Sequence, residues 1–181
     1  QAQDSDRRVG ELAGDRRSVV DAAVVDDDDL EVVAAPAEDV DEPGDRPVQQ
    51  VVRVERVNVE SGGQAIVLEA VGRNLYMPIW VADREAMVAR GYLQGQRPPR
   101  PMTHDLLLNA VTSLGGRITQ VFVSDLRGRT VIGRVDLIQN GVARQLDSRS
   151  SDAVCIGLGA RVPIFIMIHV LAQAGMTRAQ L

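Results

Sequence analysis

The chain has 181 residues with a formal net charge of −5, one cysteine and no lysine, so all 20 basic residues are arginines. This length is enough for one domain with a hydrophobic core. One cysteine excludes an internal disulfide and a cysteine-built zinc site, and the lack of lysine excludes a lysine base, Schiff base or phosphate-loop lysine. No run of about 18 apolar residues occurs, so we expect no membrane-spanning helix.

The charge is divided unevenly along the chain. Residues 1–47 hold 15 of the Asp and Glu residues and five arginines, whereas residues 48–181 hold ten and 15. The first segment lacks aromatic residues, contains four successive aspartates at 26–29 and is interrupted by prolines, which predicts an acidic disordered tail. We interpret it as a solubilising segment or as an electrostatic mimic of nucleic acid that competes for a basic domain at 48–181. We expect a cytoplasmic location, with a removed N-terminal targeting segment as the alternative.

Residues 48–93 predict three strands and a helix. Val52, Val54, Val57 and Val59 alternate with polar residues, with one slip near Glu55-Arg56, which indicates a strand. Strands at 65–71 and 75–81 follow, separated by glycine-containing turns. Asp83 is then expected to cap a helix that extends to about Leu93.

A proline-broken loop at 95–101 leads to a second predicted helix. We place its N-cap at Thr103 and its end at Gly115-Gly116. Its apolar residues recur at helical spacing, and they are Leu106, Leu107, Ala110, Val111 and Leu114.

The same order of elements then repeats. Strands are predicted at 118–124, 130–138 and 142–146, with a hairpin turn at Asn140-Gly141 and a helix capped by Ser150 or Ser151 that reaches about Gly159. A further strand at 163–168 and a short helix at 170–174 complete the chain. The expected fold is α+β, with two β-β-β-α units, mostly antiparallel pairing and helices packed on the sheet.

Two segments carry most of the functional information, Arg100 to Leu106 and Asp147 to Ala153. Each places arginine, carboxylate and hydroxyl side chains just before or within the first turn of a predicted helix. Ionisable groups at such a boundary cap the helix, bind a ligand or take part in catalysis.

These segments belong to a longer ordered pattern. It comprises the Met77-Pro78-Ile79 strand, Glu85-Ala86, the segments 100–106 and 147–153, and Pro163-Ile164. Together they resemble the bifunctional nuclease domain family over about residues 50–175, although Ser150 stands where that family usually has proline. The resemblance implies an α+β domain, self-association, and nuclease activity on RNA and DNA in some members. It does not assign catalytic residues.

The chemistry of the two segments allows a structural and a functional interpretation. In the structural one, Thr103 and Ser151 lie at helix starts, Asp105 and Asp152 suit the helix dipoles, and Arg149 pairs with Asp147. In the functional one, His104, Asp105 and Asp152 are catalytic, with His104 as general acid or base. Substrate would then be bound by Arg100, Thr103, Arg149 and Ser151.

A nuclease of this kind works with or without a metal ion. In the metal-assisted route, which we favour, Asp105, Asp147 and Asp152 hold Mg²⁺ or Mn²⁺, because hard cations prefer oxygen ligands. In the metal-free route His104 acts as base while arginines neutralise the phosphate, and a paired-histidine mechanism would need His169. No organic cofactor is expected, because the glycine pairs do not form a dinucleotide fingerprint.

Binding to the nucleic-acid backbone is expected to be sequence-tolerant, because aromatic residues are few. The competing class is a non-catalytic, oligomeric binding or regulatory module that recognises nucleic acid or another anion through the same Arg and Asp segments. Convergence of these side chains on one open cleft would favour catalysis or ligand binding, and mutual burial would favour a structural role. We also expect a homo-oligomer, because the strands at 75–81 and 162–168 are strongly apolar.

Overall fold

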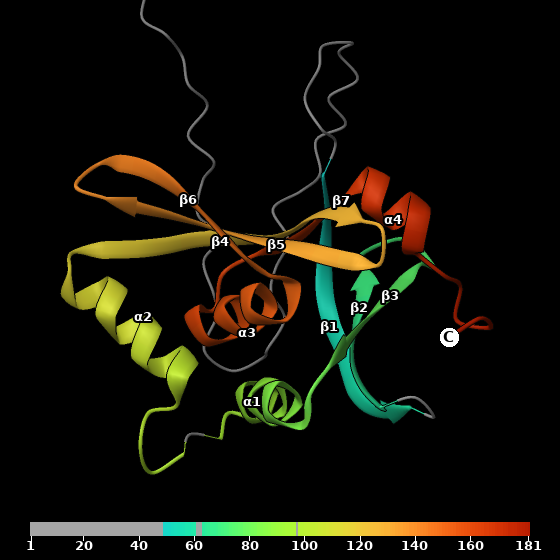
Figure 1. The fold of residues 1–181 in the computed structure, drawn as a ribbon, viewed down its shortest axis with the longest axis horizontal. Helices are drawn as coiled ribbons and strands as arrows, with labels where there is room; N and C mark the ends of the chain where they lie inside the picture. The colour runs from blue at the N-terminus through green and yellow to red at the C-terminus, as the bar shows by residue number, and fades with distance from the viewer. Residues whose placement is uncertain (1–48, 61–62, 97) are drawn as a thin grey trace, which may run out of the picture.

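A computed structural model describes residues 49–60, 63–96 and 98–181, so the predicted acidic tail at 1–47 lies outside the described residues. The first half holds β1 Gln49–Glu60, β2 Gly63–Ala70, β3 Tyr76–Val81, α1 Asp83–Leu93 and α2 Thr103–Ser113 (Figure 1). The second half holds β4 Gly116–Arg127, β5 Thr130–Gln139, β6 Val142–Arg149, α3 Ser150–Ala160, β7 Ile164–Met167 and α4 Ile168–Ala174.

The strands form one mixed sheet in the order β3-β2-β1-β7-β4-β5-β6. β7 lies at its centre, antiparallel to β1 and parallel to β4, while the other neighbours pair antiparallel. Helices α1, α2 and α3 lie on one side of the sheet, and α4 lies beside β7 on the other (Figure 1). The predicted α+β class is confirmed.

The two β-β-β-α units keep the same spacing along the chain. β4 begins at Gly116, 67 residues after the start of β1 at Gln49, and α3 begins at Ser150, 67 residues after α1 at Asp83. The sheet order places the two triplets of strands in mirrored order about β7. Because of this equal spacing, Glu85 of α1 and Asp152 of α3 occupy corresponding first-turn positions in their helices.

Two local predictions for the strands are confirmed. The pairing of β1 with β2 shifts register between Val54 and Arg56, which is the slip in the alternation of the valines. Asn140 and Gly141 join β5 to β6 with φ angles of 51° and 76°. Positive φ at both positions is the geometry of a type I′ hairpin turn, which matches the twist of the flanking strands.

The predicted helix caps are wrong by one residue. Ala82, Met102 and Arg149 occupy the N-cap positions, and none of them makes a side-chain cap bond. Asp83, Thr103 and Ser150 are the first helical residues instead. As a result, each of these three helices carries an acidic side chain at its third position, where a carboxylate interacts favourably with the helix dipole.

Helix α3 is the central helix of the core. Seven of its residues are buried, among them Cys155, and a Cβ added at Gly157 would lie 2.6 Å from Val121 Cγ2. Small residues therefore let α3 approach the sheet closely. By contrast, α2 has no buried residue, and it packs on the core through the partly buried Leu108 and Val111. No helix within the described part of the chain is long and apolar enough to span a membrane.

Candidate functional site

Side chains from the first turns of three helices meet around one arginine. Arg149 Nε donates to Asp152 Oδ2 at 2.7 Å, and its Nη2 donates to Asp152 Oδ1 at 3.0 Å and to Glu85 Oε1 at 3.1 Å. His104 Nε2 lies 3.1 Å from Asp152 Oδ1. These four residues, Glu85, His104, Arg149 and Asp152, are called the arginine cluster below.

The local fold explains how the arginine cluster forms. β6 runs directly into α3, so Arg149 sits at the junction with extended backbone angles while Asp152 is one helical turn further on. Gly133 of the neighbouring β5 has no side chain, and a Cβ there would lie 2.6 Å from the carbonyl oxygen of Arg149. Because Gly133 has no side chain, β5 can pack against the start of α3. This close contact fixes the position of the Arg149 backbone.

Charge and burial determine the protonation states in the cluster. Burial by itself would raise the pKa of Asp152, but hydrogen bonds from Arg149 and His104 outweigh it and lower that pKa below its usual value. The hydrogen bond with Asp152 likewise raises the pKa of Arg149. The Arg149 side chain is nevertheless 68% exposed, whereas the His104 side chain is 14% exposed. The guanidinium therefore faces solvent, while the imidazole is more enclosed.

Glu85 was not among the predicted site residues. Its Oε1 accepts from Arg149, while its Oε2 is buried and has no hydrogen-bond partner. A signal was present in the sequence, because Glu85-Ala86 precedes Asp152-Ala153 by 67 residues and both pairs occupy the same place in their helices. The two equivalent carboxylates bind the same guanidinium.

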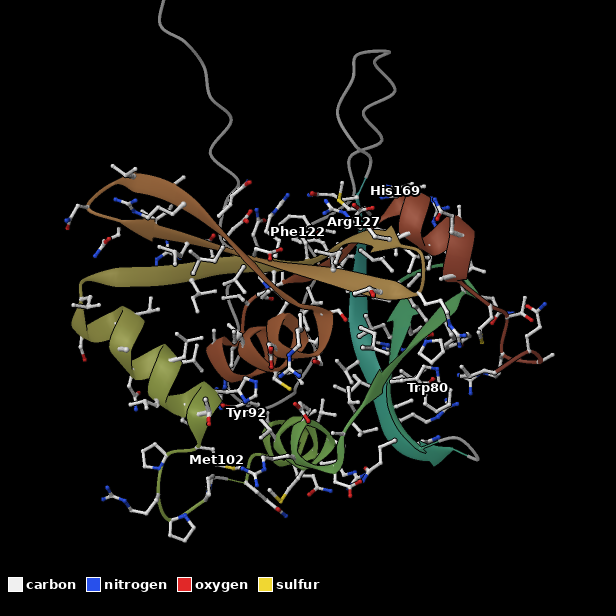
Figure 2. All side chains as sticks on the ribbon, viewed as in Figure 1. Trp80, Tyr92, Met102, Phe122, Arg127 and His169 are labelled. Carbon is white, nitrogen blue, oxygen red and sulfur yellow. The ribbon has the colours of Figure 1, made fainter. Side chains whose placement is uncertain are left out.

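Asp105 lies close to the cluster in sequence but takes other partners. Its Oδ1 accepts from the Tyr92 hydroxyl at 2.8 Å, and its Oδ2 accepts from the Met102 backbone N–H at 2.9 Å. The second bond satisfies a free amide at the start of α2. Tyr92 and Met102 lie near each other below α2 and α3 (Figure 2).

The other predicted site residues are dispersed. Asp147 pairs across β6 and β5 with Arg134, and side-chain alternation directs it to the sheet face opposite the helices. Arg100 and Thr103 are exposed near the start of α2, and Ser151 is buried. The structure thus brings together His104, Arg149 and Asp152, and places Asp105 and Asp147 apart from them.

The expected metal ligands therefore do not share one place. In the described ranges, no group of three or more His, Cys, Asp or Glu side chains is arranged to hold a metal ion. Asp152 and Glu85 are near each other, and Arg149 bonds to both.

His169 belongs to a separate pair. Its Nε2 lies 3.5 Å from Asp125 Oδ1, and Asp125 also accepts from Arg127 Nε at 2.9 Å. The hydrogen bond from Arg127 is the main factor that lowers the pKa of Asp125. Figure 2 shows His169 and Arg127 beside α4, away from Tyr92 and Met102.

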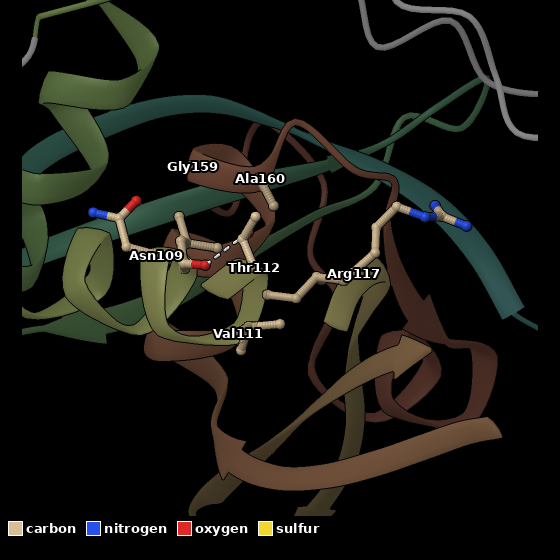
Figure 3. Close-up of a pocket in the computed structure, with 8 residues that line it drawn as sticks. Asn109, Val111, Thr112, Arg117, Gly159 and Ala160 are labelled. Carbon is tan, nitrogen blue, oxygen red and sulfur yellow. Dashed lines mark hydrogen bonds between the residues drawn. The ribbon is translucent and has the colours of Figure 1, made fainter. Parts of the chain in front are cut away.

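Two adjoining cavities follow α2 where it faces α3. The larger, of about 400 Å³, is bordered by Tyr92, Asp105 and the prolines at 98, 99 and 101. The smaller, of about 220 Å³, continues toward Arg117, and Figure 3 shows Thr112 there with its hydroxyl turned back to the Leu108 carbonyl oxygen. Leu108, Asn109 and Gly159 line both, so the cavities form one groove along the helix.

Comparisons with known proteins place the chain in a family. The chain is 35% identical to an uncharacterized protein of Mycobacterium tuberculosis over 127 residues, which cover 69% of this chain and 76% of that one. It is 26% identical over 139 residues to Bifunctional nuclease 1 of Oryza sativa subsp. japonica and to Bifunctional nuclease of Oryza minuta. These residues cover 75% of this chain and 42% of each plant protein. The family model of the bifunctional nuclease domain matches residues 66–179, which include the whole arginine cluster, and the chain therefore belongs to that family.

Proposed function

We propose that the chain is a nuclease that hydrolyses phosphodiester bonds of RNA or DNA with little sequence specificity. The observation that carries the proposal is the arginine cluster, in which an exposed guanidinium is fixed by two carboxylates beside a histidine. Its family membership and the names of its plant relatives support the same activity.

Arg149 binds the phosphate in this proposal. Glu85 and Asp152 engage its Nε and Nη2, so the guanidinium is held in one orientation while its Nη1 is left for a substrate oxygen. A preorganised donor of this kind stabilises charge that develops on phosphate in the transition state. The first turns of α1, α2 and α3 add positive dipole ends nearby.

His104 transfers the proton. Because the Asp152 carboxylate is an acceptor, His104 Nε2 carries the hydrogen of their 3.1 Å contact and Nδ1 is left as the base. Asp152 fixes the tautomer and stabilises the imidazolium that forms, as the carboxylate does in a catalytic triad. Nδ1 accepts the proton of the attacking hydroxyl or water, and the same group returns a proton to the leaving oxygen.

Metal assistance remains a second proposed route. Of the three aspartates expected to hold Mg²⁺ or Mn²⁺, Asp152 alone belongs to the cluster, and Glu85 is the carboxylate beside it. Their oxygens suit a hard cation, but Arg149 already forms an ion pair with each carboxylate, so the residues as placed fit the arginine better than an ion. A cleavage rate that persists in EDTA would exclude this route, and one restored by Mn²⁺ would establish it.

A non-catalytic module is the second candidate function. The observation that favours it is that His104, Asp152, Glu85 and Arg149 are paired with one another. In that case the cluster binds an anion without turning it over.

We also propose self-association. The apolar strands at 75–81 and 164–167 pack largely into the chain's own core, apart from Trp80, which is exposed, whereas Leu106, Leu107 and Leu114 of α2 are exposed together on one helix. Light scattering on Leu106→Ser/Leu107→Ser would test this.

The deciding experiment is cleavage of labelled single-stranded RNA and duplex DNA. His104→Ala and Arg149→Ala should each lower the rate by about a hundredfold or more. His169→Ala and Arg129→Ala are the matched controls, since they remove the same side chains away from the cluster, and they should change the rate less than twofold. Wild-type protein that binds both nucleic acids and cuts neither would establish the module instead.

A further inference from the structure

The larger cavity beside α2 is not used by the proposed chemistry. We propose that it binds a nucleobase that carries an exocyclic amino group, adjoining the phosphate held by Arg149. The inference rests on the proposed function and adds a substrate subsite to it. The residues that carry it are Tyr92, Asp105 and Asn109.

The position of the cavity follows from two consecutive residues. His104 directs its ring to Asp152 in the arginine cluster, and Asp105 directs its carboxylate to Tyr92 at the cavity. The first turn of α2 therefore borders both places. A nucleotide has its phosphate and its base at opposite ends, and the two places can receive those ends from one nucleotide.

The size and the walls of the cavity suit a partly apolar ring. Its volume of about 400 Å³ lies within the range of small-molecule sites. The apolar part of its wall comprises Pro98, Pro99, Pro101, Leu108 and Leu158, with the Tyr92 ring beside them. Enzymes that take up a single base commonly hold it between apolar and aromatic side chains and recognise its edge by hydrogen bonds.

The polar groups of the cavity determine the kind of base. The Asp105 carboxylate accepts one hydrogen bond at each oxygen, and each oxygen has a second lone pair for a further donor. Asn109 is exposed on the same side of α2 and offers both a donor and an acceptor. Gln96 and Arg161 also line the cavity, and of its polar residues Asp105 alone offers acceptors only, so it is the Asp105 carboxylate that favours the amino groups of cytosine and adenine over the carbonyl oxygens of uracil and hypoxanthine.

One such subsite is consistent with low sequence specificity. It produces a preference at a single nucleotide, while neighbouring nucleotides are bound through their phosphates. The preference would appear as unequal cleavage of homopolymers.

The test is calorimetric titration of the full chain with nucleosides, which lack phosphate and so report on the cavity alone. Cytidine should bind about tenfold more tightly than uridine, and adenosine about tenfold more tightly than inosine. Asn109→Ala should weaken cytidine binding by about tenfold. Ser113→Ala, an exposed change on the same helix that lines neither cavity, should leave it unchanged, and so should Arg149→Ala.

Equal binding of cytidine and uridine, or undiminished binding by a folded Asn109→Ala, would overturn the inference. So would a wild-type protein that binds no nucleoside at about 10 mM, a limit roughly tenfold above the usual upper KM of about 1 mM. Cleavage without nucleoside binding refutes the subsite and leaves the nuclease standing. Nucleoside binding without cleavage refutes the nuclease and supports the subsite.

Discussion

Asp152 connects His104 and Arg149 in the cluster. One of its oxygens bonds to His104 and both bond to Arg149, so the residue orients an imidazole and a guanidinium together. Its lowered pKa means that folding favours the carboxylate form. A group whose pKa is depressed in the folded state adds stability above its unfolded pKa of about 3.9, and this contribution is lost as the pH falls through the folded value.

Asp152→Asn should lower the free energy of unfolding by on the order of 1 kcal/mol at pH 7. The difference from wild type should shrink as the pH drops below about 4, because the wild-type carboxylate then becomes neutral as well. Urea unfolding at both pH values measures it. Asp147→Asn, an exposed change on β6, is the control. If Asp152→Asn lowered the free energy of unfolding equally at pH 3 and pH 7, the carboxylate form of Asp152 would not be the source of the stability.

Cys155 should be chemically silent in the folded protein. Burial is the main cause that raises the pKa of its thiol to about 12, and the carboxylates of Asp152 and Glu85 add to this. Because the thiolate is the reactive form, a disulfide reagent at pH 8 should leave the thiol unmodified until denaturant is added. Rapid modification of the native protein would show that α3 opens readily.

Residue chemistry was predictable from the sequence where it depended on local position. The sequence singled out His104, Arg149 and Asp152 because ionisable groups at a helix start usually cap the helix, bind a ligand or take part in catalysis. Asp105 and Asp147 were predicted to bind the same metal ion as Asp152, but Asp105 bonds to Tyr92 and Met102 and Asp147 lies on another face of the sheet. Sequence spacing does not reveal which way a side chain points from a helix turn or a strand. Whether any of the three binds a metal stays a prediction.

At the scale of elements, the contact between β5 and the start of α3 positions the site. The Gly133 Cα lies where any side chain would press on the Arg149 backbone and on Ala153 Cβ, at 2.6 Å and 2.9 Å from an added Cβ. Both neighbours belong to the segment that carries Arg149 and Asp152. A change at this glycine therefore reaches the cluster through the backbone.

Gly133→Ala should destabilise the protein by about 1–3 kcal/mol and lower cleavage more than binding to the nucleic-acid backbone. Gly157→Ala is a matched change, because its Cβ meets Val121 and Ile164 in the core instead of the cluster. It should cost comparable stability. Thermal unfolding measures the stability of both variants, and cleavage rates measured below their melting temperatures give the effect on activity. An equal loss of cleavage in both variants would argue against a positioning role for Gly133.

Strands and turns were predictable from the sequence where a residue pattern is compatible with only one backbone geometry. Asn140-Gly141 specifies a two-residue turn, and the valines of β1 locate both the strand and its irregularity. The leucines of α2 were harder to interpret, because an apolar face at helical spacing does not identify the surface that it packs on. Leu106 and Leu114 prove to be exposed, while Leu108 and Val111 make the core contacts.

At the scale of the whole molecule, arginines outnumber acidic residues in the domain that we propose to bind nucleic acid. Residues 48–181 carry an excess of five arginines over acidic residues, and several arginines, such as Arg53, Arg127 and Arg178, are committed to ion pairs. The order of elements along the chain was predictable because it repeats. The place of β7 between the two triplets was not, since strand order depends on long-range pairing.

Binding to nucleic acid should depend steeply on salt. Raising the salt concentration from about 50 to 200 mM should weaken the affinity for single-stranded RNA by about tenfold or more, because each neutralised phosphate releases counterions. Fluorescence anisotropy at several salt concentrations gives the slope. Arg149→Ala should reduce the slope by about one unit, and an affinity independent of salt would show that the arginines are not the contact surface.

The constant spacing of the two units has a consequence for how the protein can be divided. Ala82 stands 67 residues before Arg149, so the first half contributes a carboxylate at Glu85 without a cation of its own, and the second half contributes the cation. Neither half therefore holds the complete arginine cluster. If the proposed nuclease activity resides in this cluster, two fragments separated between α1 and α2 should each be inactive, and mixing them should restore activity in proportion to the complex that they form.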